Sequence, residues 1–159
     1  MKIFRCDQVR QIDEQTIRNE PVASIDLMER AAGKLCGWYT GRFDRTRPVK
    51  IFAGPGNNGG DGLALARMLF HERYEIEVYF AGFSENRSAD WLVNLKRLKE
   101  ETSVPFTELM NGDEFPLINE GDVIIDAILG SGISRPAEGL ASDIIGLIND
   151  SPATVLSID

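Results

Sequence analysis

One run of nine residues, Gly54–Gly62, has a composition that suggests ligand chemistry. It reads GPGNNGGDG, lies between a strand-like and a helix-like run, and contains the spacing Gly-x-Gly-x-x-Gly. Glycines let backbone N–H groups approach a phosphate, and a helix N-terminus adds partial positive charge. The alternative is a tight turn without a ligand, since Asn-Gly and Asp-Gly are common turn dipeptides. The context favours anion binding, and a side chain at Gly59 is then expected to occupy the space of the phosphate while leaving the fold largely intact.

Two common phosphate sites do not fit this run. A nicotinamide-dependent dehydrogenase places an acid at the end of the second strand to hold the ribose, but the strand predicted at 75–80 has no carboxylate there. Glu85 comes late in the following loop, and Arg87 could suit a phosphate instead. A Walker-type loop needs Lys followed by Ser or Thr, and Asp61 and Gly62 stand in that place.

A second cluster begins at Asp126, which closes a strongly apolar strand, and continues into the small loop at 130–132, Gly-Ser-Gly. Asp159 ends the last strand at the equivalent edge. Parallel strands are expected to bring Asp126, Asp159 and the segment around Asn58 toward one crevice. Carboxylate and amide oxygens together suit a hard cation. The structural alternative is that Asp126 caps a neighbouring turn.

Alternating strand-like and helix-like runs must position these residues. They predict right-handed βαβ units and a mainly parallel sheet covered on both faces. Ser24 and Ser88 are the expected N-caps of two helices, and Trp91 and Leu92 are expected in the core. Strands are expected at 49–53, 75–80, 104–107, 123–125 and 154–158, and helices at 7–18, 24–40, 63–70, 88–98 and 140–148.

The composition excludes several classes of partner. The chain has 159 residues, 43% of them hydrophobic and 26% charged, and a net charge of −8. Such an acidic balance argues against broad binding to nucleic acid or to acidic membranes. No export signal and no run long enough to span a bilayer is present. We therefore expect a cytoplasmic protein in which Cys6 and Cys36 are reduced thiols.

The chain resembles a known family, the NAD(P)HX epimerases or YjeF N-terminal domains, over its whole length. The resemblance is carried by the helix at 27–31, Leu-Met-Glu-Arg-Ala, by Asn-Asn-Gly-Gly-Asp-Gly at 57–62 and by Asp-Ala-Ile-Leu-Gly-Ser-Gly at 126–132. Ser-Ile-Asp at 157–159 resembles the start of the family's Asp-Ile-Pro-Ser-Gly motif. The segment at 57–62 is far more specific than the generic glycine spacing.

The resemblance implies a Rossmann-like three-layer fold and repair of damaged cofactor. The implied substrates are hydrated NADH and NADPH (NADHX and NADPHX), whose R and S epimers the enzyme interconverts. Asn58 and Asp126 match the ligands of a potassium ion, and Asp159 matches the family's aspartate at the nicotinamide ring, where we assign it the catalytic exchange of a proton. The implied substrate-binding residues are Asn57, Asn58, Gly59, Gly60, Asp61, Gly130, Ser131, Gly132, Ile133, Ser134, Arg135, Pro136 and Asp159.

We expect a single YjeF N-terminal-like domain over residues 1–159. We also expect the sequence to be a C-terminally incomplete fragment, which ends within the Asp-Ile-Pro-Ser-Gly motif. The family's third side-chain ligand for potassium, the serine of that motif, then lies beyond Asp159. We also expect a homodimer and a fused or separate dehydratase that acts on the S epimer. The alternatives are a non-catalytic dinucleotide-binding or dimerising scaffold of the same fold, and a dinucleotide enzyme of another kind.

Overall fold

A five-stranded parallel sheet forms the centre of the protein. The computed structural model describes residues 6–20, 22–133 and 136–158, and within them the strand order is β3-β2-β1-β4-β5. The mainly parallel sheet expected from the sequence is confirmed. The strands are β1 (Val49–Ala53), β2 (Ile76–Ala81), β3 (Phe106–Leu109), β4 (Val123–Ala127) and β5 (Thr154–Ser157), and the helices are α1 (Cys6–Asn19), α2 (Ser24–Thr40), α3 (Asn57–His71), α4 (Ala89–Glu101) and α5 (Leu140–Asp150).

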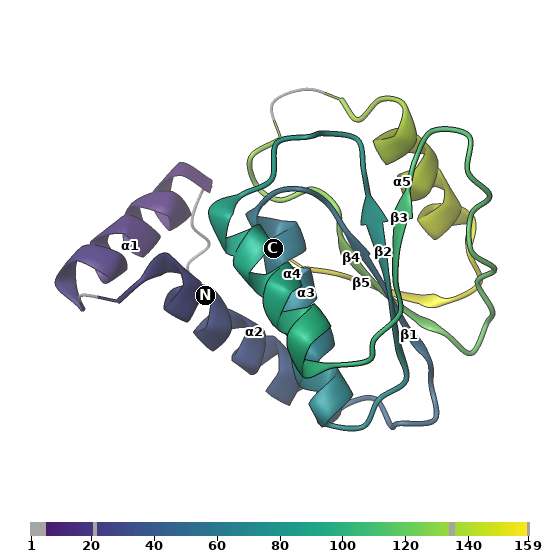
Figure 1. Cartoon of the computed structure of the whole chain (residues 1–159), viewed down its shortest axis with the longest axis horizontal. Coiled ribbons are helices and arrows are strands. Elements are labelled where there is room, and N and C mark those ends of the chain that lie inside the picture. The colour runs from purple at the N-terminus through teal and green to yellow at the C-terminus, as the bar shows by residue number, and fades with distance from the viewer. Residues whose placement is uncertain (1–5, 21, 134–135, 159) are drawn as a thin grey trace.

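Helices cover both faces of the sheet, which confirms the three-layer architecture. Figure 1 shows α2, α3 and α4 on one side and α5 on the other. Alternate residues of β1 serve the two cores: Ile51 packs in the core with α3 and α4, and Phe52 packs in the core with α5. Every residue of β1 is buried, as expected for the central strand of a sheet covered on both faces.

Two local expectations about α2 and α4 are wrong. Ala23, not Ser24, is the N-cap of α2, and no side chain caps that end. Ser24 lies inside the helix, and its hydroxyl donates a hydrogen bond to the Asp90 carboxylate of α4 at 2.5 Å. In α4, Trp91 is buried as expected, but Leu92 is 52% exposed because the next position along a helix turns away from the core. Ser88 does cap α4, accepting a hydrogen bond from the backbone N–H of Trp91.

Ion pairs join the three helices on the first face. The Arg67 guanidinium of α3 donates to both carboxylate oxygens of Glu29 on α2, at 2.5 and 2.6 Å. It also reaches Glu101 at the end of α4 at 3.2 Å. Arg97 of α4 adds a second cation to Glu29 at 2.8 Å. Arg67 is largely buried, so this network fixes the direction in which α3 leaves the sheet edge.

Helix α1 stands apart from the sheet, beyond α2 (Figure 1). Its apolar side chains include Val9 and Ile12, which are largely exposed, and Ile17, which is partly covered. The described helices are all too short or too polar to span a lipid bilayer.

A buried lysine pairs with acids on the α5 face. The Lys50 ammonium of β1 lies 2.5 Å from the Glu77 carboxylate of β2 and 3.9 Å from that of Asp122. The hydrogen bond from Lys50 is the main reason that the pKa of Glu77 lies below its ordinary value of 4.5, although partial burial opposes the shift. The Tyr79 hydroxyl donates a further hydrogen bond to the same carboxylate.

Replacing Glu77 by glutamine should make the protein's stability less sensitive to acid. Because the pKa of Glu77 is lower in the folded state, its contribution is complete above the unfolded-state pKa and is lost as pH falls through the folded-state pKa. The urea midpoint should therefore fall less between about pH 7 and about pH 3.5 in Glu77→Gln than in the unaltered protein. Glu75→Gln, at an exposed position on the same strand end, is the control; equal acid losses in both variants would contradict the assignment.

Candidate functional site

The glycine-rich run is the start of a helix rather than a loop. Helix α3 begins at Asn57, six residues before the predicted start, and the N–H of Gly60 already donates to the carbonyl of Gly56 at 3.1 Å. Gly56 is the N-cap, and no side chain caps this end. The first N–H groups of a helix have no partner within it. Gly56 and Asn57 are exposed, so the N–H of Asn57 faces an open region, whereas Asn58 and Gly59 are buried.

Close backbone packing explains two of the glycines. A Cβ atom at Gly54 would lie 1.9 Å from the carbonyl oxygen of Ile128, and one at Gly59 would lie 1.8 Å from the carbonyl oxygen of Gly54. Any larger residue at either position would displace backbone. The expectation that a side chain at Gly59 leaves the fold largely intact is therefore wrong. This glycine lets the start of α3 pack against the turn that follows β1.

Asn58, which lines two cavities, has a buried oxygen without a hydrogen-bond partner among the described residues. Its side chain is 7% exposed, and its Nδ2 donates to the carbonyl of Leu129 at 3.0 Å. Its Oδ1 is buried and has no hydrogen-bond partner in the described part of the chain. Buried acceptors are rarely left unpaired in native proteins. An oxygen placed this way fits a ligand that accepts electron density, such as a cation.

Asp126 lies near the end of β4 and caps a turn, as the structural alternative expected, while its role as a cation ligand stays a prediction. Its Oδ1 accepts a hydrogen bond from the N–H of Ile128 at 3.1 Å, which caps the turn after β4. Its Oδ2 faces the hydroxyl of Ser157 on β5 at 3.4 Å. Asn58 and Asp126 thus both bond to the segment 128–129, and the sheet edge brings them into one neighbourhood.

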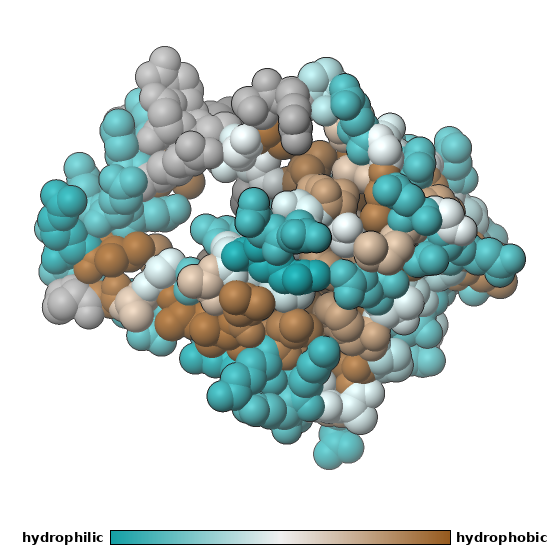
Figure 2. All heavy atoms as spheres, turned by 45° about the horizontal axis from the view of Figure 1, so that its top comes forward, coloured by the Kyte–Doolittle hydropathy of each residue, from teal (hydrophilic) through white to brown (hydrophobic). Residues whose placement is uncertain are grey.

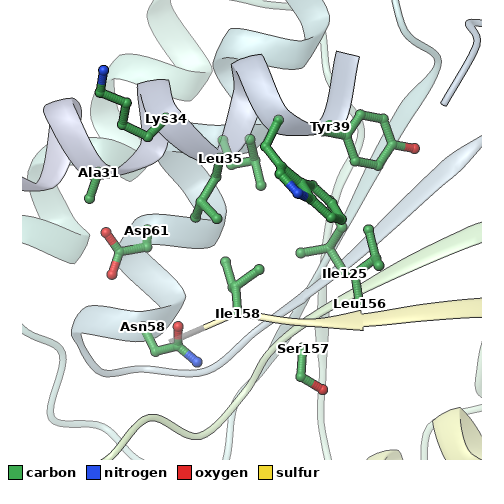
Figure 3. Close-up of a pocket in the computed structure, with 12 residues that line it drawn as sticks. Ala31, Lys34, Leu35, Tyr39, Asn58, Asp61, Ile125, Leu156, Ser157 and Ile158 are labelled. Atoms are coloured by element: carbon green, nitrogen blue, oxygen red, sulfur yellow. The ribbon is translucent and has the colours of Figure 1, made fainter. Parts of the chain in front are cut away.

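Two adjoining cavities open beside Asn58. The first cavity, about 590 Å³, lies between α2, α3 and β5, and includes Leu35, Trp38, Ser157 and Ile158. In Figure 3 Asp61 and Asn58 of α3 lie on the left of the view, Asn58 below Asp61, while Lys34 extends away from them. The second cavity, about 640 Å³, is bounded by α1, α2 and the start of α3. Ala31, Asn58 and Asp61 line both.

Hydrophobic surface borders the second cavity. In Figure 2 the α1 lobe stands to the left of the main body, with brown atoms on both sides of the gap. Val9 and Ile17 of α1 face Leu27 and Met28 of α2 across this cavity. Asn57, which lines the same cavity, brings the uncapped start of α3 into it.

A third cavity, about 390 Å³, lies on the α5 side of the same loops. Its wall includes Phe83, which follows β2, and Glu138, which precedes α5. Gly56, Ile128, Gly130 and Gly132 line both the second and the third cavities, so the two adjoin around the start of α3.

Most of the implied substrate residues fall on these cavities. Asn57, Asn58, Asp61, Gly130, Ser131, Gly132, Ile133 and Pro136 line at least one of the three. Gly59 and Gly60 are buried in the first turn of α3. Ser134, Arg135 and Asp159 lie outside the described residues, so the catalytic role of Asp159 stays a prediction.

Charge around the cavities is mostly negative. Asp13, Glu14, Asp61 and Glu138 line them, and among their described lining residues Lys34 is the one base. Burial raises the pKa of Tyr39, which lines the first cavity, so its hydroxyl stays protonated in neutral solution. An anionic ligand here would therefore depend on backbone N–H groups and on any bound cation.

Some contributors to the site were not identified from the sequence. Trp38 and Lys34 belong to α2 and were not among the predicted site residues. Glu138 and Phe83 lie in loops with no motif. Arg87, which the sequence suggested for a phosphate, is engaged elsewhere: it pairs with Glu108 at 3.0 Å and stacks over the rings of Phe80 and Trp91.

Comparison with known proteins agrees with this arrangement. Residues 24–159 match the family described as YjeF-related protein N-terminus. The chain belongs to this family. A relative from Oenococcus oeni, named NAD(P)H-hydrate epimerase, is 38% identical over 153 residues, which cover 96% of this chain and 70% of the relative. The resemblance inferred from the motifs is thereby confirmed.

Two further relatives of this YjeF-related domain are informative. A Coxiella burnetii protein named bifunctional NAD(P)H-hydrate repair enzyme Nnr is 29% identical, and the match covers 99% of this chain but 31% of that protein. The crystal structure of the yeast protein ynu0 (YNL200c) has a TM-score of 0.81 at 25% identity, covering 100% of this chain and 70% of the yeast chain. The Rossmann-like fold expected of the family is confirmed.

Gly54→Ala should destabilise the protein far more than Gly56→Ala. The first substitution forces a Cβ against the Ile128 backbone, whereas the space around Gly56 is open and its φ of −88° suits any residue. We expect a loss of about 1–3 kcal/mol or more for Gly54→Ala and of less than about 1 kcal/mol for Gly56→Ala, since glycine is preferred to alanine at an N-cap. Urea unfolding of both variants measures the difference. Equal midpoints would show that the close contact between the turns after β1 and β4 does not limit stability.

Proposed function

We propose that this chain interconverts the R and S epimers of hydrated NADH and NADPH. The observation that carries the proposal is the buried, unpartnered Oδ1 of Asn58 beside the uncapped start of α3 and the Asp61 carboxylate. The family and the epimerase name of the Oenococcus oeni relative support the same activity. A non-catalytic scaffold would have no need of this set of polar groups, so it is the weaker alternative.

The start of α3 would hold the pyrophosphate. Its uncapped N–H groups and the positive end of the helix dipole favour an anion. The exposed Gly56 and Asn57 leave the approach open, and the adjoining second and third cavities leave room for a group on either side. Local donors would in this way bind an anionic substrate to a protein of net charge −8.

The residues present fit a potassium ion. Asn58 offers a buried amide oxygen, and Asp126 offers a carboxylate attached to the same segment. Oxygen ligands of this kind suit a hard cation. The described residues contain no group of three or more His, Cys, Asp or Glu that would instead suit a transition metal. When bound, such an ion would supply a fixed positive charge near the substrate.

The reaction needs one group that gives and takes a proton. The substrate carries a hydroxyl on the ring carbon next to nitrogen, and the nitrogen lone pair can expel it once the hydroxyl is protonated. The products of this step are water, an iminium-type ring and the carboxylate that lost the proton. Water then adds to the other face of the ring and returns its proton to that carboxylate. We assign the role to Asp159.

The proposal also covers the oligomeric state, the partner enzyme and the cellular location. A homodimer and a fused or separate dehydratase stay predictions; the Coxiella burnetii relative, which is named bifunctional, supports the idea of a fused partner for some members. A cytoplasmic location is likewise inferred from the sequence alone.

Potassium should stabilise the protein through Asn58. A ligand that binds only the folded state raises the melting temperature, and at about ten times the dissociation constant we expect a rise of about 2–6 °C when KCl replaces choline chloride at equal ionic strength. Asn58→Leu should lose this rise. The matched control is Asn94→Ala, because Asn94 is also buried with an unpartnered Oδ1 but lines none of the three cavities. A potassium effect that survives in Asn58→Leu would exclude Asn58 as a ligand.

Asp159→Asn should abolish most of the epimerisation while changing substrate binding much less. The asparagine keeps the shape and a hydrogen bond but cannot exchange a proton, and general acid–base help is worth about 100- to 10,000-fold. The assay supplies pure R epimer and follows the S form by chromatography against the spontaneous rate. Asp150→Asn, at the exposed end of α5, serves as control. Undiminished turnover by Asp159→Asn would remove the acid–base role.

A further inference from the structure

We propose that the third cavity holds the adenosine half of the substrate, with Phe83 against the adenine and Glu138 at the ribose. The inference rests on the proposed function in one respect, namely that the substrate is a dinucleotide. It gives the cavity on the α5 side of the loops a specific occupant. Phe83 and Glu138 would then be the residues that contact that part of the ligand.

The strand order divides the carboxyl edge of the sheet into two halves. The order β3-β2-β1-β4-β5 reverses direction between β1 and β4, and ligands of open parallel sheets bind at such a point. The start of α3 follows β1 and lies at the division. Ser157 and Ile158 of the β5 half line the first cavity, and Phe83 follows β2 in the other half. A dinucleotide whose pyrophosphate lies at the start of α3 would extend into both.

Phe83 is an aromatic residue on a turn held by backbone contacts, and its side chain remains available to a ligand. Its N–H donates to the carbonyl of Ala81, and the N–H of Gly82 donates to the carbonyl of Leu109. Gly82 also packs so closely that a Cβ there would lie 2.9 Å from the sulfur of Met110. These contacts hold the turn, yet 37% of Phe83 is exposed. Bases stack readily on exposed aromatic rings of this kind.

The rest of the third cavity suits an uncharged adenosine. Its wall is formed by small or apolar residues, including Pro55, Ala137 and Ala141. Its volume of about 390 Å³ falls in the range of small-molecule sites. Gly56 and Gly130 connect it with the second cavity, so the sugar would follow directly from the phosphates.

Glu138 supplies the acid that the end of β2 lacks. It lines the third cavity, is exposed, and makes no hydrogen bond or ion pair with the described residues. In dinucleotide-binding folds a carboxylate accepts a hydrogen bond from a ribose hydroxyl and disfavours a phosphate on that ribose. Arg87, the base nearest in sequence to Phe83, is paired with Glu108. The site therefore favours NADHX over NADPHX.

Calorimetry with three stable probes tests the adenosine site directly: adenosine monophosphate, NAD and NADP. Phe83→Ala should weaken binding of all three by about 10-fold or more, and Phe83→Trp should restore it. Phe115→Ala is the matched control, because Phe115 is 36% exposed and lines none of the three cavities. Equal affinities in Phe83→Ala and Phe115→Ala, with both variants folded by urea titration, would overturn the proposal.

The same titrations test Glu138. The unaltered protein should bind NAD more tightly than NADP, and Glu138→Gln should reduce that ratio by about 3-fold or more, since it removes the like charge. An exposed acid that only favours the start of α5 would change stability and leave the NAD-to-NADP ratio alone. An unchanged ratio in a folded Glu138→Gln protein would therefore overturn the ribose assignment.

Epimerisation assays separate this proposal from the proposed function. If the unaltered protein epimerises hydrated NADH and Phe83→Ala has the same KM, the adenosine site is wrong and the function stands. If the protein binds adenosine monophosphate through Phe83 but epimerises neither substrate, the adenosine site is supported and the function is wrong. A raised KM with little change in kcat for Phe83→Ala supports both.

Discussion

The rest of the structure depends on a tight backbone contact between two turns at the edge of the sheet. The turn after β1 and the turn after β4 approach so tightly that Gly54 has no room for a Cβ beside Ile128, and Gly59 has none beside Gly54. This approach lets α3 begin immediately after β1. It also brings Asn58 within hydrogen-bonding distance of Leu129. The positions of the helix start, the buried amide and the neighbouring cavities all depend on it.

The arrangement reconciles an acidic protein with an anionic ligand. Backbone N–H groups at the start of α3 carry partial positive charge whatever the side chains are. The carboxylates of Asp61 and Asp126 would repel a phosphate placed beside them, whereas carboxylate oxygens attract cations. Donors at the start of α3 and carboxylates on α3 and β4 therefore favour groups of opposite charge, and net charge is a poor guide to what the site binds.

Much of the fold could be predicted because its patterns are local. Apolar runs such as Val49–Ala53 identify buried strands, and the alternation with helices predicts a parallel sheet. The start of α3 was misplaced because glycines are poor helix formers, and here tertiary packing overrides that preference. Ser24 was wrongly predicted as an N-cap because its hydroxyl donates a hydrogen bond to Asp90, which is distant in sequence.

The candidate site was predicted less evenly. Asn58 and Asp126 stand in motifs, so the sequence identified them. No sequence motif identifies Phe83 or Glu138, because the cavity that they line is formed by loops after three different strands. The role of Gly59 depends on a backbone atom five residues away whose position only the folded turn defines. Contacts between residues that the fold brings together can be identified only in the folded structure.

The strand order also has a consequence for the kinetics of folding. β1 pairs with β2 on one side and with β4 on the other, and the Asn58–Leu129 hydrogen bond joins residues 71 positions apart. Contacts of such long range form slowly, because a large loop must close before they stabilise the chain. The first βαβ unit, from β1 to β2, can assemble from nearer contacts. A chain that has folded only so far contains the whole glycine-rich run but lacks the contact between Asn58 and Leu129, so recovery of the proposed ligand binding would report the pairing of β1 with β4.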